Sequence, residues 1–76
     1  MSRYITLTEN EIRTFKRQYP CSGIPELDMI GFGFAENGDL FDIQPVKDGV
    51  PIDSSTFDGE GLAALAEDAK AKIFKV

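Results

Sequence analysis

The sequence predicts an α+β fold within one domain spanning residues 1–76: a helix, an antiparallel β-hairpin or three-stranded meander, and a C-terminal helix packed on the sheet. Either both helices cover the Phe/Ile face of the sheet or one covers each face. Three observations predict this fold: a helix start signal near residue 8, an Asn-Gly pair between alternating apolar residues, and a second helical stripe after residue 58. The hydrophobic fraction of 42% and six phenylalanines are sufficient for a compact core, so the composition argues against disorder.

The first helix is predicted by a capping box, in which Thr8 is the N-cap and Glu11 follows three residues later. Apolar side chains then recur at helical spacing: Ile12, Phe15 and Tyr19. Pro20 disfavours a helical backbone in the residue before it, so we expect the helix to run from Glu9 to Gln18 or Tyr19. Residues 4–7 could form a short strand ahead of it.

The centre of the chain is predicted to be a β-hairpin turning at Asn37-Gly38, because this dipeptide favours the type I′ turn. That turn places Phe34 opposite Phe41 and Ile43 opposite Phe32. Strand alternation then gathers five large apolar side chains on one face: Ile30, Phe32, Phe34, Phe41 and Ile43.

The opposite face of this hairpin carries Gly31, Gly33 and Ala35, an unusual run of small residues. Glycine weakens a strand and often marks the close approach of another backbone or a ligand. A helix, a further strand or a partner chain could lie there. If residues 29–35 form an exposed edge, that edge could join two copies of the chain into a homodimer or accept a strand of a partner.

After the hairpin, Asp48-Gly49 predicts a second turn and a third strand at residues 50–53, with Val50 and Ile52 on the core face. The second helix is predicted to begin after Asp58 as N-cap and to pack on the sheet. Its apolar stripe has clean helical spacing: Leu62, Leu65, Ala66, Ala69 and Ile73.

Three carboxylates sit at or near the hairpin tip: Glu36, Asp39 and Asp42. A calcium loop would need its glycine later and a glutamate at its twelfth position, which this stretch does not provide. A catalytic carboxylate pair would need an apolar pocket to separate the two pKa values. We therefore interpret these acids as solvent-exposed residues of a turn and as candidates for binding another protein.

Two arginines of the first helix, Arg13 and Arg17, lie near Lys16 on one side of its apolar stripe. They could contact an anion or a protein partner. Alternatively they form a solvated face, with Glu9 and Arg13 as an i,i+4 ion pair.

The formal net charge is −5, and between Glu26 and Ala69 the only base is Lys47. Nucleic-acid binding needs clustered lysines and arginines, so the charge argues against direct contact with nucleic acid. It suits a partner with a basic surface, or it serves solubility alone. The residues that open the sequence predict no secretory signal, and no apolar stretch is long enough for a membrane span.

One cysteine, Cys21, cannot form an internal disulfide, which favours a reducing compartment such as the cytoplasm. The chain has no histidine to activate this thiol and no cysteine–histidine spacing typical of zinc sites. We expect a semi-buried structural thiol, no cofactor and no metal, and therefore a protein that is not an enzyme.

The stretches YPCSGIPE, FAENGDLFDI and DGEGLAALAEDAK resemble a group of small proteins of unknown function from bacteria and prophages. The resemblance covers about residues 8–71 and implies a bacterial or phage accessory protein, without implying catalytic residues. The preferred function is a non-enzymatic protein-binding module, such as an inhibitor of a basic partner. The alternatives are a homodimeric structural or assembly protein, and a small ligand-binding protein or enzyme.

Overall fold

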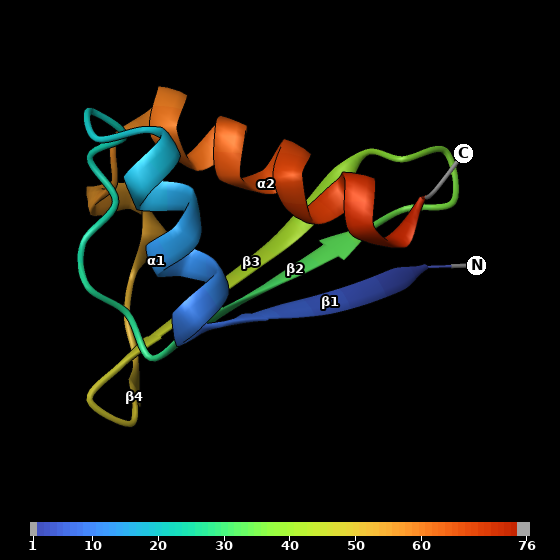
Figure 1. Cartoon of the computed structure of the whole chain (residues 1–76). Coiled ribbons are helices and arrows are strands. Elements are labelled where there is room, and N and C mark those ends of the chain that lie inside the picture. The colour runs from blue at the N-terminus through green and yellow to red at the C-terminus, as the bar shows by residue number, and fades with distance from the viewer. Residues whose placement is uncertain (1, 75–76) are drawn as a thin grey trace.

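A computed structural model describes residues 2–74, which form a four-stranded antiparallel sheet and two α-helices (Figure 1). The elements in chain order are β1 (Arg3–Thr8), α1 (Glu9–Gln18), β2 (Met29–Phe34), β3 (Leu40–Lys47), β4 (Val50–Pro51), the 3-10 helix η1 (Ser54–Thr56) and α2 (Gly59–Ile73). The strand order is β1-β2-β3-β4. The α+β prediction is confirmed, and β1 enlarges the predicted meander to four strands.

Helix α1 begins at the predicted capping box. The Glu11 backbone N–H donates to Thr8 Oγ1 at 3.4 Å, and the Thr8 backbone N–H donates to Glu11 Oε1 at 3.0 Å. The helix ends at Gln18, as predicted, but the inclusion of Tyr19 in the core stripe is wrong, since 53% of this residue is exposed. Tyr19 is the C-cap, with φ −130°, so helical spacing no longer directs its side chain.

The hydrophobic core lies between the sheet and both helices, which cover the same sheet face (Figure 1). Phe32 and Phe34 are each 1% exposed, and their ring centroids lie 6.3 Å apart. The core also takes apolar side chains from β1, α1, the segment before β2, and α2: Leu7, Ile12, Phe15, Ile24, Leu27, Leu65, Ala66 and Ala69. Of the two predicted arrangements, with both helices on the Phe/Ile face or one helix on each face, the structure has the first.

The β2–β3 loop differs from the predicted type I′ turn. The Gly38 N–H donates to Ala35 O at 2.8 Å, and the Ala35 N–H donates to Asp39 O at 2.7 Å. Gly38 has φ 92°, whereas Asn37 is not among the described residues with positive φ. This is the arrangement of a three-residue hairpin loop, in which only the last loop residue needs the left-handed region.

The longer loop changes which residues face each other at the tip. Phe34 pairs with Leu40 rather than with Phe41, and a β-bulge at Phe41 restores the predicted pairing of Gly33 with Asp42. Because Phe41 is the extra residue, it does not join the core and is 52% exposed. The prediction that Phe41 is a core residue is therefore wrong, whereas those for Ile30, Phe32 and Phe34 are confirmed, and Ile43 packs against the core while partly buried.

The second turn has the geometry predicted for the first. Asp48 and Gly49 have φ 52° and 76°, as a type I′ turn requires, and Lys47 pairs with Val50. Strand β4 is shorter than predicted and ends at Pro51, which cannot donate to a strand ladder. Val50 is 58% exposed rather than part of the core, while Ile52 does pack against the core.

Helix α2 matches its prediction closely. The Asp58 side chain caps it by accepting the Glu60 N–H at 3.4 Å. The predicted stripe faces the sheet, because its central residues are buried and its end residues, Leu62 and Ile73, pack partly buried against the core.

Candidate functional site

The sheet face opposite the helices is accessible, and we call it the open face. Strand alternation places on it the side chains that do not point to the core. The exposed fractions are large for apolar residues: 65% for Tyr4, 52% for Phe41 and 43% for Met29. The open face comprises Tyr4, Thr6, Met29, Gly31, Gly33, Phe41, Asp42, Gln44 and Val46.

Two aromatic rings meet over Gly33 on this face. Tyr4 pairs with Gly33 across the β1–β2 ladder, and its ring meets Phe41 edge to face with centroids 5.6 Å apart. A Cβ at position 33 would lie 2.8 Å from Tyr4 Cε1 and 3.1 Å from Phe41 Cζ. The two rings therefore occupy the space that a side chain at position 33 would fill, which explains one of the glycines in β2.

The other glycine, Gly31, leaves a space that no ring fills. A Cβ there would meet Thr6 Oγ1 at 3.7 Å and Gln44 O at 3.8 Å, which are ordinary contact distances. Above Gly31 lies a depression of about 130 Å³, which we call the hollow. Its lining residues are Tyr4, Ile5, Thr6, Gly31, Phe32, Asp42 and Gln44.

The three predicted acids lie along one end of the molecule but in different settings. Glu36 and Asp39 belong to the β2–β3 loop, where the Asp39 carboxylate accepts the Asn37 side-chain amide at 3.0 Å. Asp42 lies on β3 within the open face, where it accepts Gln44 Nε2 at 3.0 Å. The loop also meets a base, since a Cβ at Gly38 would lie 3.2 Å from Lys70 Nζ.

The two predicted arginines lie apart from these acids, because α1 and the β2–β3 loop are at opposite ends of the molecule (Figure 1). Arg13 Nη2 lies 3.7 Å from Glu9 Oε1, so the predicted i,i+4 pair is present. Arg17 is exposed and, with Arg13, Lys16 and Glu26, borders a shallow depression of about 270 Å³. The five predicted binding residues therefore do not form one site.

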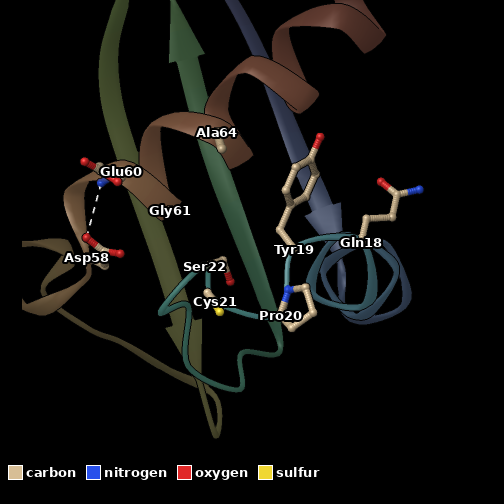
Figure 2. A pocket seen from close by; sticks show the side chains of 9 residues that line it. All are labelled: Gln18, Tyr19, Pro20, Cys21, Ser22, Asp58, Glu60, Gly61 and Ala64. Atoms are coloured by element: carbon tan, nitrogen blue, oxygen red, sulfur yellow. Dashed lines mark hydrogen bonds between the residues drawn. The ribbon is translucent and has the colours of Figure 1, made fainter.

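A larger groove, of about 360 Å³, lies between the end of α1 and the start of α2 (Figure 2). Figure 2 shows Cys21 and Ser22 between Tyr19 on one side and Asp58 on the other. The start of α2 lies against the loop that follows α1, because Gly61 packs directly on the Ser22 backbone and leaves no space for a side chain. Cys21 is exposed, so the predicted semi-buried thiol is wrong.

The groove holds two carboxylates, but their setting is not that of a catalytic pair. Asp58 is engaged as the cap of α2, and both Asp58 and Glu60 are exposed to water. Nor does the chain contain a histidine that could activate Cys21. Both carboxylates of the groove are thus exposed surface groups, one of which caps α2.

The strand predicted as an exposed edge, at residues 29–35, lies inside the sheet. Residues 29–34 form β2, which pairs with β1 on one side and β3 on the other. The predicted exposed edge near Gly31 and Gly33 is thus wrong, because β1 covers it. The pairing of β1 could not be read locally, since α1 and a linker separate β1 from β2 in the sequence. The outermost strands of the sheet are β1 and β4.

Sequence reasoning missed Tyr4 and Phe41 as surface residues. The signal that could have found them is the pair of glycines on one face of β2, because a glycine inside a strand leaves space that neighbouring rings fill.

Within residues 2–74, no group of three or more His, Cys, Asp or Glu side chains is placed to hold a metal ion. The helices in that range are too short or too polar to cross a membrane.

Comparison with models of protein families, with curated proteins and with solved structures gave no match for this chain.

Proposed function

We propose that the chain is a small non-enzymatic protein-binding module that holds a partner with a basic surface on its open face. The observation that carries this proposal is the placement of both helices on one side of the sheet, which leaves Tyr4, Phe41 and Met29 between 43% and 65% exposed on the other. Tyr4 and Phe41 are in contact, and adjoining exposed apolar side chains on a domain surface commonly mark interaction sites.

The residue types on the open face suit a protein partner. Tyr and Phe supply large contact areas at low conformational cost, and aromatic residues and methionine are enriched in interface cores. Tyr4 and Phe41 already contact each other, so part of their ordering is complete before a partner binds. Small polar groups such as Thr6 and Gln44 surround them and can donate or accept hydrogen bonds.

The charge around this face selects the kind of partner. Asp42 lies on the face, and Asp39 and Glu36 continue the acidic character into the adjoining loop. With a net charge of −5, the chain attracts a basic surface and accelerates encounter with it at low salt. A nucleic-acid-handling protein presents such a surface. Following the resemblance to bacterial and prophage proteins, the module would act as an inhibitor or accessory protein in a reducing, cytoplasmic setting.

Affinity capture from a bacterial lysate tests this proposal, with three immobilised forms compared in parallel. These are the wild type, the open-face variant Tyr4→Ser/Phe41→Ser, and a control variant, Glu67→Gln, altered on exposed α2. We expect a basic protein that the wild type and the control retain and that the open-face variant loses. Charge reversal of Glu36, Asp39 and Asp42 to lysine is expected to lose it as well.

The captured protein is then purified and its binding measured by calorimetry at increasing salt. Affinity that falls with ionic strength supports the electrostatic part of the proposal. Equal retention by the wild type and the open-face variant would contradict the assignment of the site. A chain whose sedimentation depends on its own concentration, with no captured protein, would favour the homodimer instead.

A further inference from the structure

We propose that the hollow over Gly31 binds an arginine side chain of the protein partner. This inference rests on the proposed function and names the chemistry of its central contact. The hollow lies beside the Tyr4–Phe41 pair, so an arginine placed there would sit between this pair and Met29 on the open face. Arginines that anchor interfaces commonly occupy such positions, surrounded by contacts that exclude water.

Tyr4 supplies the apolar wall of the hollow. Tyr4 borders the hollow, and its ring makes an edge-to-face contact with Phe41 at an interplanar angle of 82°. A guanidinium that lies against an aromatic ring gains cation–π attraction, and its planar shape suits a shallow depression. The glycine at position 31 lets the arginine approach the strand backbone closely.

The polar atoms around the hollow are suited to a donor with positive charge. Asp42 contributes a carboxylate, Gln44 an amide oxygen and Thr6 a hydroxyl oxygen. The Gln44 amide nitrogen donates to Asp42 Oδ2 at 3.0 Å, which orients both side chains. A carboxylate can accept about four hydrogen bonds, so this one leaves capacity for a guanidinium.

Among the described residues 2–74, none that lines the hollow supplies a positive charge. The residues that line the hollow include one carboxylate and neither lysine nor arginine. Arg3, on the same strand as Tyr4, is directed to the other side, where it donates to Ile73 O at 3.0 Å and lies 5.2 Å from the Phe74 ring centroid. The hollow therefore combines the carboxylate of Asp42 with the aromatic side chain of Tyr4.

Filling the hollow with a side chain at position 31 provides the first test. Gly31→Val adds a side chain where a Cβ meets only ordinary contacts, and β-branched residues favour strands. We expect the variant to keep or raise its melting temperature and to lose affinity for the captured basic partner by about tenfold or more, equivalent to ~1.4 kcal/mol. Unchanged affinity in a folded Gly31→Val variant would overturn the proposal.

A peptide titration provides the second test and identifies the charge. The probe is acetyl-Gly-Ser-Arg-Leu-Ser-Gly-amide, added to 15N-labelled protein, and its control is the same peptide with citrulline, which keeps the shape but lacks the charge. We expect the arginine peptide to shift the amide signals of Thr6, Gly31 and Gln44, and the citrulline peptide to shift them much less. Equal shifts with both peptides, or no shifts at these amides, would count against an arginine site.

A third test removes the negative charge of Asp42. Asp42→Asn keeps an acceptor for Gln44 and removes the charge, so we expect it to weaken binding of the arginine peptide about fivefold while stability is kept. The matched control, Asp48→Asn, removes an acid at the β3–β4 turn, where asparagine tolerates the positive φ. Equal weakening by both variants would indicate general charge attraction and overturn the local contact.

The two variants distinguish the proposal that the open face binds a protein from the proposal that the hollow binds an arginine. If the Tyr4→Ser/Phe41→Ser variant loses the partner but Gly31→Val retains it, the open face binds a protein and the arginine assignment is wrong. If both variants retain the partner, the proposed function of the open face is itself wrong.

Discussion

The two faces of the sheet carry aromatic side chains from neighbouring positions and bury them to opposite extents. Phe32 and Phe34, on the covered face, are each 1% exposed, whereas Tyr4 and Phe41, on the open face, are 65% and 52% exposed. Within each pair the two rings are in contact. Ring contact alone therefore does not make a core, because the helices α1 and α2 are what remove Phe32 and Phe34 from water.

The covered face holds residues that stabilise the fold, whereas the open face holds apolar residues that remain exposed to water. Burial of the covered face is what stabilises a domain of this size, since a short chain has little apolar surface to spare. A chain that still leaves Tyr4, Phe41 and Met29 in water has kept apolar surface outside the core. The following predictions test whether the two faces are independent in this sense.

The largest expected effect is on the covered face. Phe32→Ala removes a ring that is fully surrounded by core residues and leaves a cavity, at a cost of about 3–5 kcal/mol. That cost is comparable to the whole stability expected for a small domain, so we expect the variant to be largely unfolded at 37 °C. Urea unfolding followed by circular dichroism measures it. A cooperative transition close to that of the wild type would contradict the assignment of the core.

The next effect contrasts the two glycines of β2. Gly33→Ala forces a Cβ against the Tyr4 and Phe41 rings and against Asp42 Cβ, so we expect a destabilisation of about 1–3 kcal/mol. Gly31→Ala is the matched control and should stabilise the strand by about 0.5–1 kcal/mol, because its Cβ has ordinary contacts. Thermal unfolding compares them, and equal effects at the two positions would refute the ring arrangement over Gly33.

A third prediction concerns the helices that cover the sheet. The Thr8 backbone N–H, followed by the ammonium of Lys72 at 3.1 Å from Glu11 Oε2, holds the pKa of Glu11 below its ordinary value. Because the folded pKa is lowered, the carboxylate stabilises the fold fully above the ordinary pKa of a glutamate, and this contribution is lost as pH falls through the lowered pKa. Glu11 is partly exposed, so the effect is below about 1 kcal/mol.

Glu11→Gln tests this contribution, because glutamine keeps an acceptor for the Thr8 N–H and removes the charge. We expect the variant to be less stable than the wild type near neutral pH and the difference to shrink on acidification. Unfolding free energies measured by urea titration at several pH values give the answer. A difference that stays constant with pH would show that the charge of Glu11 contributes nothing.

The fold could be predicted from the sequence wherever the signal was local. The capping box at Thr8 and the cap at Asp58 each involve atoms a few residues apart, so both helix starts were found. The register of β2 against β3 was found for Phe32 and Ile43, because only that pairing keeps the apolar residues on one face. The tip was wrong because an Asn-Gly pair fits both a two-residue and a three-residue loop.

The candidate site was predicted only in part, for a physical reason. Glu36, Asp39 and Asp42 were recognised because charge is visible in the sequence. The role of Tyr4 depends on β1 lying beside β2, and this pairing joins segments far apart in the chain. The role of Phe41 depends on the β-bulge. The longer loop shifts the pairing of the strands by one residue and the bulge shifts it back, so the rest of the hairpin pairs as predicted.

The smallest expected effect on stability belongs to the open face. Phe41→Ser removes the edge-to-face contact with Tyr4, and at a half-exposed site this costs about 0.5 kcal/mol. The same substitution should weaken binding of the captured basic partner by about 2 kcal/mol or more, as expected for an aromatic residue at an interface centre. Unfolding and calorimetry on one preparation measure both quantities. A loss of stability as large as that of Phe32→Ala would place Phe41 in the core after all, whereas a folded variant that no longer binds would show that the two faces serve separate purposes.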